Sequence, residues 1–184
     1  MNLPNTLYLP ELREMLSDGN AEELREFCTA LHPASTADFM EGLSAEEAWR
    51  VLQFAEMPVR AEIFGYLSQE RQVEILKLGD RAEMAQFIGH LPPDDRVDLL
   101  HEVEPGLVDQ LLPLMPAAER RDILRLRAFP ENTAGAVMTT EFARVSENFT
   151  VRQTLEELGR QAEDLETIYY IYVVDAEHHL VGIA

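Results

Sequence analysis

The chain has 184 residues, 46% of them apolar, and its 34 acidic residues outnumber 15 lysines and arginines to give a formal charge of −19. This length allows one or two domains with a substantial core. The charge repels phosphate backbones and anionic lipid headgroups, so it argues against nucleic acid and lipid contacts and favours cations or basic partners. An acidic surface also keeps a protein soluble, and charge alone leaves both interpretations open.

Cys28 is the single cysteine, so no disulfide can form within the chain, which fits a reducing compartment. We expect Cys28 to be a small core residue, and the single tryptophan, Trp49, to pack while remaining partly exposed. The N-terminus lacks a basic region followed by an apolar stretch, so we expect no signal peptide. No run of 18 apolar residues is present, so we expect a soluble chain that does not itself span a membrane.

The first part of the chain reads as short helices. Residues 1–9 are expected to form a loose arm, and Pro10 suits the first turn of a helix that ends near Gly19. Asn20 is expected to cap a second helix, with Glu23 as its partner in a capping box.

The segment Leu43–Leu124 then repeats itself every 24 residues. Each repeat opens with a similar motif: Leu43–Glu47, Leu67–Arg71, Leu91–Asp95 and Met115–Glu119. Three apolar rows keep the same register: Leu52, Leu76, Leu100 and Leu124; Phe39, Ile63, Phe87 and Leu111; Met40, Phe64, Ile88 and Leu112. A fixed period in this range indicates stacked units, each too small to bury its own apolar face. We therefore predict a mainly α fold, a right-handed-type superhelical solenoid of short helix pairs over residues 1–128.

Beyond the solenoid the apolar pattern changes. Residues 129–137 contain proline, polar residues and glycine, which is typical of a linker. Residues 138–184 predict an incomplete α+β domain, with its last strand uncovered by a helix. Its expected elements are a strand at Phe142–Val145, a helix at Val151–Arg160 capped by Thr150, a strong strand at Ile168–Val174 and the beginning of a strand at Leu180–Ala184.

Two stretches in this region, Thr133–Thr139 and Glu166–Asp175, resemble the MgtE family of magnesium transporters. The resemblance extends over roughly residues 20–184. It implies a superhelical N domain followed by part of the first of two CBS domains, and in the family these precede a plug helix and a dimeric transmembrane pore. The partners it implies are therefore the parent protein's second CBS domain, plug helix and transmembrane domain, within a homodimer.

The resemblance also implies a regulatory role at the cytoplasmic face of the cell membrane. In the family, Mg²⁺ bridges acidic faces of the cytosolic domains and holds the pore closed. Carboxylates that repel each other when bare attract once hard cations lie between them. The implied function is therefore a magnesium sensor that gates a pore, and not an enzyme.

The resemblance places magnesium contacts at Glu62, Asp94 and Asp98, and at the backbone carbonyl of Ala136, where the family usually has glycine. Asp94 and Asp98 are four residues apart and share one helix face, where a bridging cation would relieve their repulsion. Asp94 also suits the positive end of a helix dipole without any metal. Spacing alone therefore leaves both explanations open.

Tyr170 corresponds to a nucleotide contact of the family, which implies ATP binding in a complete CBS pair, although a strand tyrosine can equally pack across the sheet. No nucleophile–base motif, phosphate loop or zinc signature occurs in the sequence. The alternative to a magnesium sensor is a soluble adaptor, with a protein-binding solenoid and a nucleotide-binding CBS half.

Overall fold

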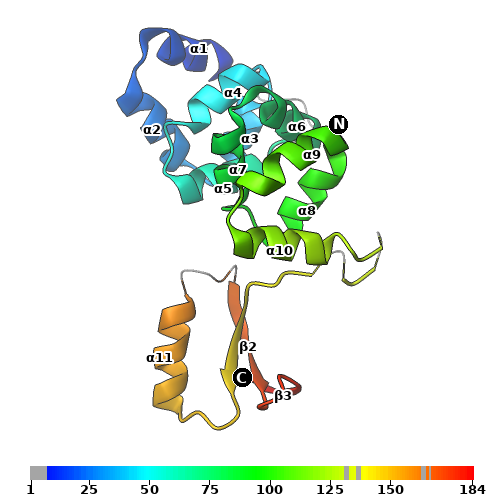
Figure 1. Cartoon of the computed structure of the whole chain (residues 1–184). Helices are drawn as coiled ribbons and strands as arrows, with labels where there is room; N and C mark the ends of the chain where they lie inside the picture. The colour runs from blue at the N-terminus through cyan, green and yellow to red at the C-terminus, as the bar shows by residue number, and fades with distance from the viewer. Residues whose placement is uncertain (1–7, 131–132, 136–137, 163–164, 166) are drawn as a thin grey trace. The chain divides into compact units, whose positions relative to one another are not determined.

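The computed structural model describes residues 8–130, 133–135, 138–162, 165 and 167–184 (Figure 1). The chain divides into two compact units. The helical unit comprises Met1–Leu91 and Asp95–Arg127, and the second unit comprises Pro92–Asp94 and Ala128–Ala184. The structure is mainly helical with a small three-stranded sheet near the C-terminus, so the predicted fold class is confirmed.

Helices α1 to α10 follow one another at a constant spacing, each beginning 12 residues after the one before. Their bounds are Leu9–Asp18 (α1), Ala21–Ala30 (α2), Pro33–Met40 (α3), Ala45–Leu52 (α4), Met57–Gly65 (α5), Gln69–Leu78 (α6), Arg81–Ile88 (α7), Pro93–Glu102 (α8), Pro105–Leu111 (α9) and Ala117–Leu126 (α10). A short 3₁₀ turn, η2, spans Leu112–Leu114. Two helices thus make one 24-residue repeat, and α1 with α2 form an additional repeat before those found in the sequence.

Helices at equivalent places in successive repeats pack on one another, for example α3 on α5, α4 on α6 and α7 on α9. The apolar rows fill the space between them: Leu52, Leu76 and Leu100 are fully buried. The row ends at Leu124, which is 53% exposed, because α10 is the last helix of the unit and has no following repeat to cover it. The predicted register of the solenoid is therefore confirmed except at its end.

Aromatic and sulfur side chains complete this core. The Trp49 ring meets the Phe87 ring edge to face at 5.1 Å, and only 7% of Trp49 is exposed, so the expectation of partial exposure was wrong. The physical reason is the Arg60 guanidinium, which lies 5.5 Å from the Trp49 ring centroid and covers it. Cys28 is buried as expected, and burial raises the pKa of its thiol to about 11.

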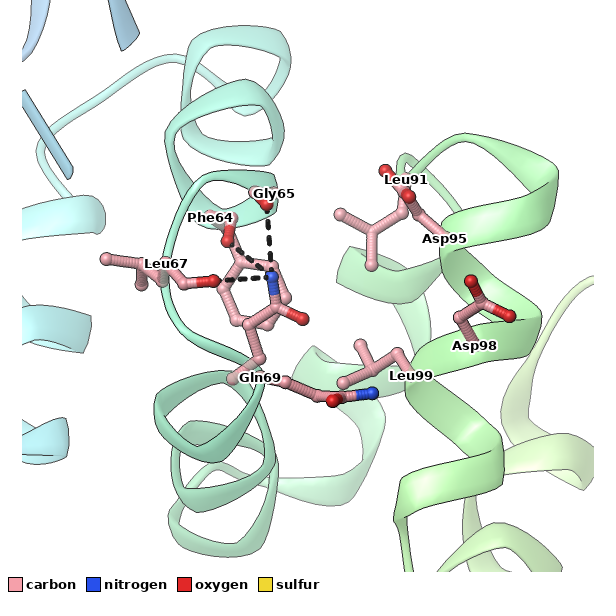
Figure 2. A pocket seen from close by; sticks show the side chains of 9 residues that line it. Phe64, Gly65, Leu67, Gln69, Leu91, Asp95, Asp98 and Leu99 are labelled. Carbon is pink, nitrogen blue, oxygen red and sulfur yellow. Dashed lines mark hydrogen bonds between the residues drawn. The ribbon is translucent and has the colours of Figure 1, made fainter. Parts of the chain in front are cut away.

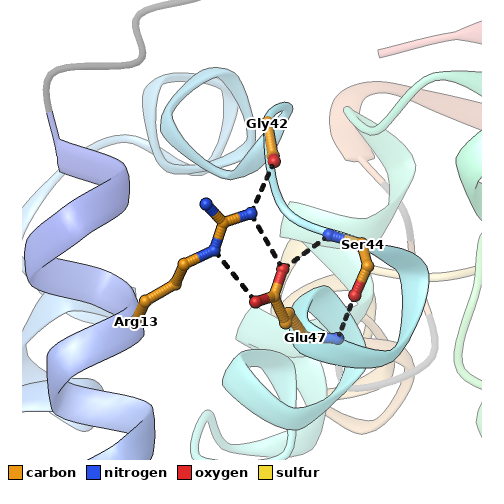
Figure 3. Close-up of polar contacts among 4 residues, drawn as sticks. All are labelled: Arg13, Gly42, Ser44 and Glu47. Carbon is orange, nitrogen blue, oxygen red and sulfur yellow. Dashed lines mark hydrogen bonds and ion pairs between the residues drawn. The ribbon is translucent and has the colours of Figure 1, made fainter.

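Polar groups satisfy the helix ends and join the repeats. Ser44 and Glu47 form a capping box at the start of α4: the Ser44 hydroxyl accepts from the Glu47 N–H, and Glu47 accepts from the Ser44 N–H (Figure 3). Arg13 of α1 donates from Nε to Glu47 at 2.9 Å and from Nη2 to the Gly42 carbonyl at 3.3 Å. The hydrogen bond from Arg13 lowers the pKa of the Glu47 carboxyl. This contact therefore stabilises the fold above the unfolded pKa of about 4.3 and is lost as the pH falls through the lower folded value.

Carbonyl groups at helix C-termini are bonded by side chains from the following helix. Arg60 of α5 donates from Nε to the Leu52 carbonyl at 3.0 Å, and from Nη2 to the carbonyls of Gln53 at 3.0 Å and Ala55 at 3.2 Å. These carbonyls would otherwise lack a partner, because the last turn of a helix has no intrahelical donors left. Arg60 thus fixes how α5 leaves the end of α4.

The second unit contains β1 (Phe142–Ser146), α11 (Val151–Gln161), β2 (Thr167–Val174) and β3 (Leu180–Ile183). The strand order is β1-β2-β3: β1 is parallel to β2, and β2 is antiparallel to β3. Helix α11 connects the parallel pair and packs on β1 (Figure 1). These are the four elements that the sequence predicts, in the predicted order.

Candidate functional site: acidic residues of α5 and α8

The structure places the predicted magnesium contacts on two helices. Glu62 lies on α5 and Asp98 on α8, and both are exposed. Asp94 lies in the first turn of α8 and is half-buried, and its Oδ1 has no hydrogen-bond partner among the described residues. Ala136 lies outside the described residues. In the part of the chain that the structure describes, none of the three carboxylates makes a hydrogen bond or an ion pair, so all three remain available to a cation.

Helix α8 concentrates negative charge, because Asp94, Asp95 and Asp98 all lie within its first six residues. Asp94 and Asp98 share one face at a spacing of four, and Asp95 and Asp98 are neighbours at a spacing of three. Within the described ranges, however, Glu62, Asp94 and Asp98 do not gather into a cluster of three metal ligands. By themselves they offer a surface that attracts cations, and not a closed coordination cage.

Beside α8 the helical unit has a cavity of about 220 Å³. Figure 2 shows Asp95 and Asp98 on one side of this cavity, and Gly65 and Gln69 on the other. The apolar residues that line it are Phe64, Leu67, Leu91 and Leu99. Sequence reasoning missed both the cavity and the position of Asp95, because the lining comes from three helices and two turns.

A second acidic group lies in the turn between β2 and β3. Oδ1 of Asp175 accepts from the backbone N–H groups of Glu177 at 3.0 Å and His179 at 2.9 Å, and its Oδ2 lies 3.1 Å from His179 Nδ1. Possible ligand atoms of these three residues lie within 4.8 Å of one another. The backbone hydrogen bond from His179 is the main reason that the pKa of Asp175 is lowered. The turn explains this arrangement fully, so we assign it no metal.

Tyr170, the predicted nucleotide contact, lies in the central strand β2 and is 63% exposed. The neighbouring Tyr172 packs edge to face against Phe142 at 5.4 Å. The exposed ring of Tyr170 is therefore accessible to a ligand, whereas Tyr172 serves the packing between β1 and β2. None of the helices in the described ranges has both the length and the apolar content that a membrane span requires.

Solved structures resemble this arrangement closely. The chain matches the soluble part of a magnesium transporter with a TM-score of 0.85 and 32% identity, over 95% of this chain and 69% of that one. It matches the cytosolic domain of the Mg²⁺ channel MgtE in complex with ATP with a TM-score of 0.84 and 34% identity, over 94% of this chain and 71% of that one.

Sequence relatives agree with the structures. The chain is 52% identical to the magnesium transporter MgtE of Enterococcus faecalis and 45% identical to that of Thermus thermophilus, in each case over 62 residues. These alignments cover 34% of this chain and 14% of each transporter, so the chain corresponds to a small part of their length. Residues 31–132 match the model of the MgtE intracellular N domain. Because that match covers more than half of the chain, the chain belongs to the MgtE intracellular N domain family.

Proposed function

We propose that this chain is the magnesium-sensing regulatory region of an MgtE-type magnesium transporter. Mg²⁺ bound at Glu62, Asp94 and Asp98 would regulate a pore located elsewhere in the parent protein. The observation that carries this proposal is the presence, in a chain of this family, of three carboxylates that have no partner among the described residues. Under this proposal the chain binds ions and carries out no chemical reaction.

The mechanism follows from the charge of the helical unit. Bare carboxylates on facing domains repel each other, and hard cations between them turn this repulsion into attraction. Mg²⁺ would therefore favour a closed arrangement of domains, and its loss an open one, because the ion binds the two states with different affinity. Glu62, Asp94 and Asp98 would supply one side of the site, together with the Ala136 carbonyl, and a further domain would supply the other.

The partners in this proposal are parts of the parent protein. We propose that residues 1–128 are its N domain, 129–137 a linker and 138–184 part of its first CBS domain. A second CBS domain, a plug helix and a transmembrane domain would complete a homodimer. Support comes from the second unit, where Val151 and Leu155 of α11 are 79% and 65% exposed, an apolar surface that suits coverage by another domain.

ATP is the second ligand in this proposal, with Tyr170 as one of its contacts. The exposed ring of Tyr170 supports this role, as does the solved complex of a related cytosolic domain with ATP. An aromatic face can stack on an adenine ring. A Tyr170→Ala variant that bound ATP as tightly as the parent chain would contradict this assignment.

Calorimetric titration of the 184-residue chain with Mg²⁺ tests the proposed magnesium site. Because Mg²⁺ keeps most of its water unless a complete cage is present, one side of a shared site should bind weakly, with a Kd on the order of 1 mM. Replacing Asp94 and Asp98 together with asparagine should abolish this saturable binding.

The matched control is the double variant Glu70→Gln, Glu74→Gln, which removes the same charge at the equivalent positions one repeat earlier. It should bind Mg²⁺ like the parent chain. Equal loss in both double variants would show that Mg²⁺ responds only to the net charge, and micromolar binding by the parent chain would contradict a shared site.

A further inference from the structure

The cavity beside α8 combines an apolar wall with negative charge. Phe64 and Leu99 are among its apolar lining residues, and Asp95 and Asp98 are its charged ones. No lysine, arginine or histidine is among the residues that line it in the described structure. The Gln72 amide nitrogen, which also lies at the cavity, already donates to the carbonyls of Phe64, Gly65 and Leu67 at 2.9, 3.3 and 3.2 Å. Apart from the amides, the polar groups left for a ligand are therefore the carboxylates.

Comparison between repeats shows that this charge pattern is specific to one repeat. The positions 24 residues before Asp95 and Asp98 hold Arg71 and Glu74, which form an ion pair at 2.9 Å. One repeat earlier still, the same two positions hold Glu47 and Arg50, again one acid and one base. The earlier repeats thus carry their own cation at this place, whereas the repeat at α8 carries two acids.

The size and chemistry of the cavity define what could supply the missing cation. At about 220 Å³ it is smaller than the roughly 300–1,000 Å³ of sites for drug-sized ligands, so its ligand is small. A hydrated Mg²⁺ ion gains nothing from an apolar wall, because it retains its water shell. An organic cation gains twice, since its head meets a carboxylate while its alkyl stem covers Phe64 and Leu99.

We propose that this cavity binds a small organic cation, an alkyl amine or alkyl guanidine, with its charged head at Asp98 and Asp95 and its stem on the apolar wall. The guanidine head would occupy the role that Arg71 has one repeat earlier. The proposal shares Asp98 with the proposed magnesium site but does not depend on that site, because the ligand and the cavity are different.

Calorimetric titration of the 184-residue chain with agmatine, in about 0.15 M salt without Mg²⁺, tests this site. This salt concentration screens non-specific attraction to an acidic protein. We expect saturable binding that Asp98→Asn weakens at least tenfold. Gly65→Leu should weaken it similarly, because a Cβ atom at Gly65 would lie 3.8 Å from Asp95 Oδ2 and a leucine there extends into the cavity.

Two matched controls separate this site from general effects. Glu74→Gln removes one charge at the position equivalent to Asp98, and Gly65→Ala adds a methyl group that the structure accommodates, so both should bind agmatine like the parent chain. Thermal melting of each variant verifies that it is folded. Replacing agmatine with guanidinium ion, which has no stem, should lower the affinity, since each buried methylene contributes about fourfold.

The absence of saturable agmatine binding would overturn the proposal, as would equal binding by the parent, Asp98→Asn and Gly65→Leu chains. Titration of the same variants with Mg²⁺ keeps this result separate from the magnesium proposal. Gly65→Leu should lose agmatine and retain Mg²⁺ binding, and Asp94→Asn should lose Mg²⁺ and retain agmatine binding. A single pattern of loss for both ligands would show that no distinct organic-cation site exists.

Discussion

Replacing Leu100 with alanine should lower the free energy of unfolding by about 2–5 kcal/mol, the cost typical of truncating a fully buried leucine. Leu100 has no exposed surface, and it stands in one row with Leu52 and Leu76, which are buried to the same degree. Its removal leaves a cavity between stacked repeats, where the helices on both sides hold its neighbours in place. Urea denaturation followed by circular dichroism measures this loss.

Leu124 provides the matched control, because it occupies the same position of the last repeat but is 53% exposed. Leu124→Ala should cost less than about 1 kcal/mol, since most of its surface is already in water. A Leu100→Ala chain that unfolds like the parent, or equal losses in the two variants, would show that the register of the repeats is wrong.

The next largest effect is expected at Arg60, where methionine should cost about 2 kcal/mol of unfolding free energy. Methionine keeps the stem but removes the bonds to the three carbonyls of Leu52, Gln53 and Ala55, and bonds from a charged donor contribute about 1.5–3 kcal/mol. The contact with Trp49 is lost as well. The same denaturation measurement reports the change.

Arg71→Met is the control for this substitution. Arg71 makes an ion pair with Glu74 one turn along α6, and Glu74 is about half exposed. Pairs of this kind contribute roughly 0.2–1 kcal/mol, so Arg71→Met should cost less than Arg60→Met. If Arg71→Met proved the more damaging of the two, bonding of helix C-termini by Arg60 would not be what holds successive helices together.

The sequence predicted the solenoid well because its fold is written in a repeated pattern. Leu52, Leu76 and Leu100 recur at the helix period and are all buried, so the pattern determined both the helices and their buried face. The first repeat was missed because its residues differ in type: Cys28 stands where the next repeats have leucine. The burial of Trp49 was predictable, since the position 24 residues later is the apolar Val73.

The candidate sites depended more on the structure. No periodic pattern shows that Gly65, Asp95 and Asp98 line one cavity, because this requires α5 and α8 to be placed side by side. The sequence did contain one usable signal. Alignment of the repeats changes Arg71 and Glu74 into Asp95 and Asp98, which is the loss of a cation between two otherwise equivalent places.

The central claim is that Mg²⁺ joins an acidic face of the helical unit to another domain of the parent protein. Small-angle scattering of the parent's complete cytosolic region, with and without Mg²⁺, tests this claim most directly. We predict the mass of a dimer, a smaller radius of gyration with Mg²⁺, and no such compaction when Asp94 and Asp98 are both asparagine. Compaction of that double variant equal to that of the parent, or a parent region whose dimensions do not respond to Mg²⁺, would contradict the claim.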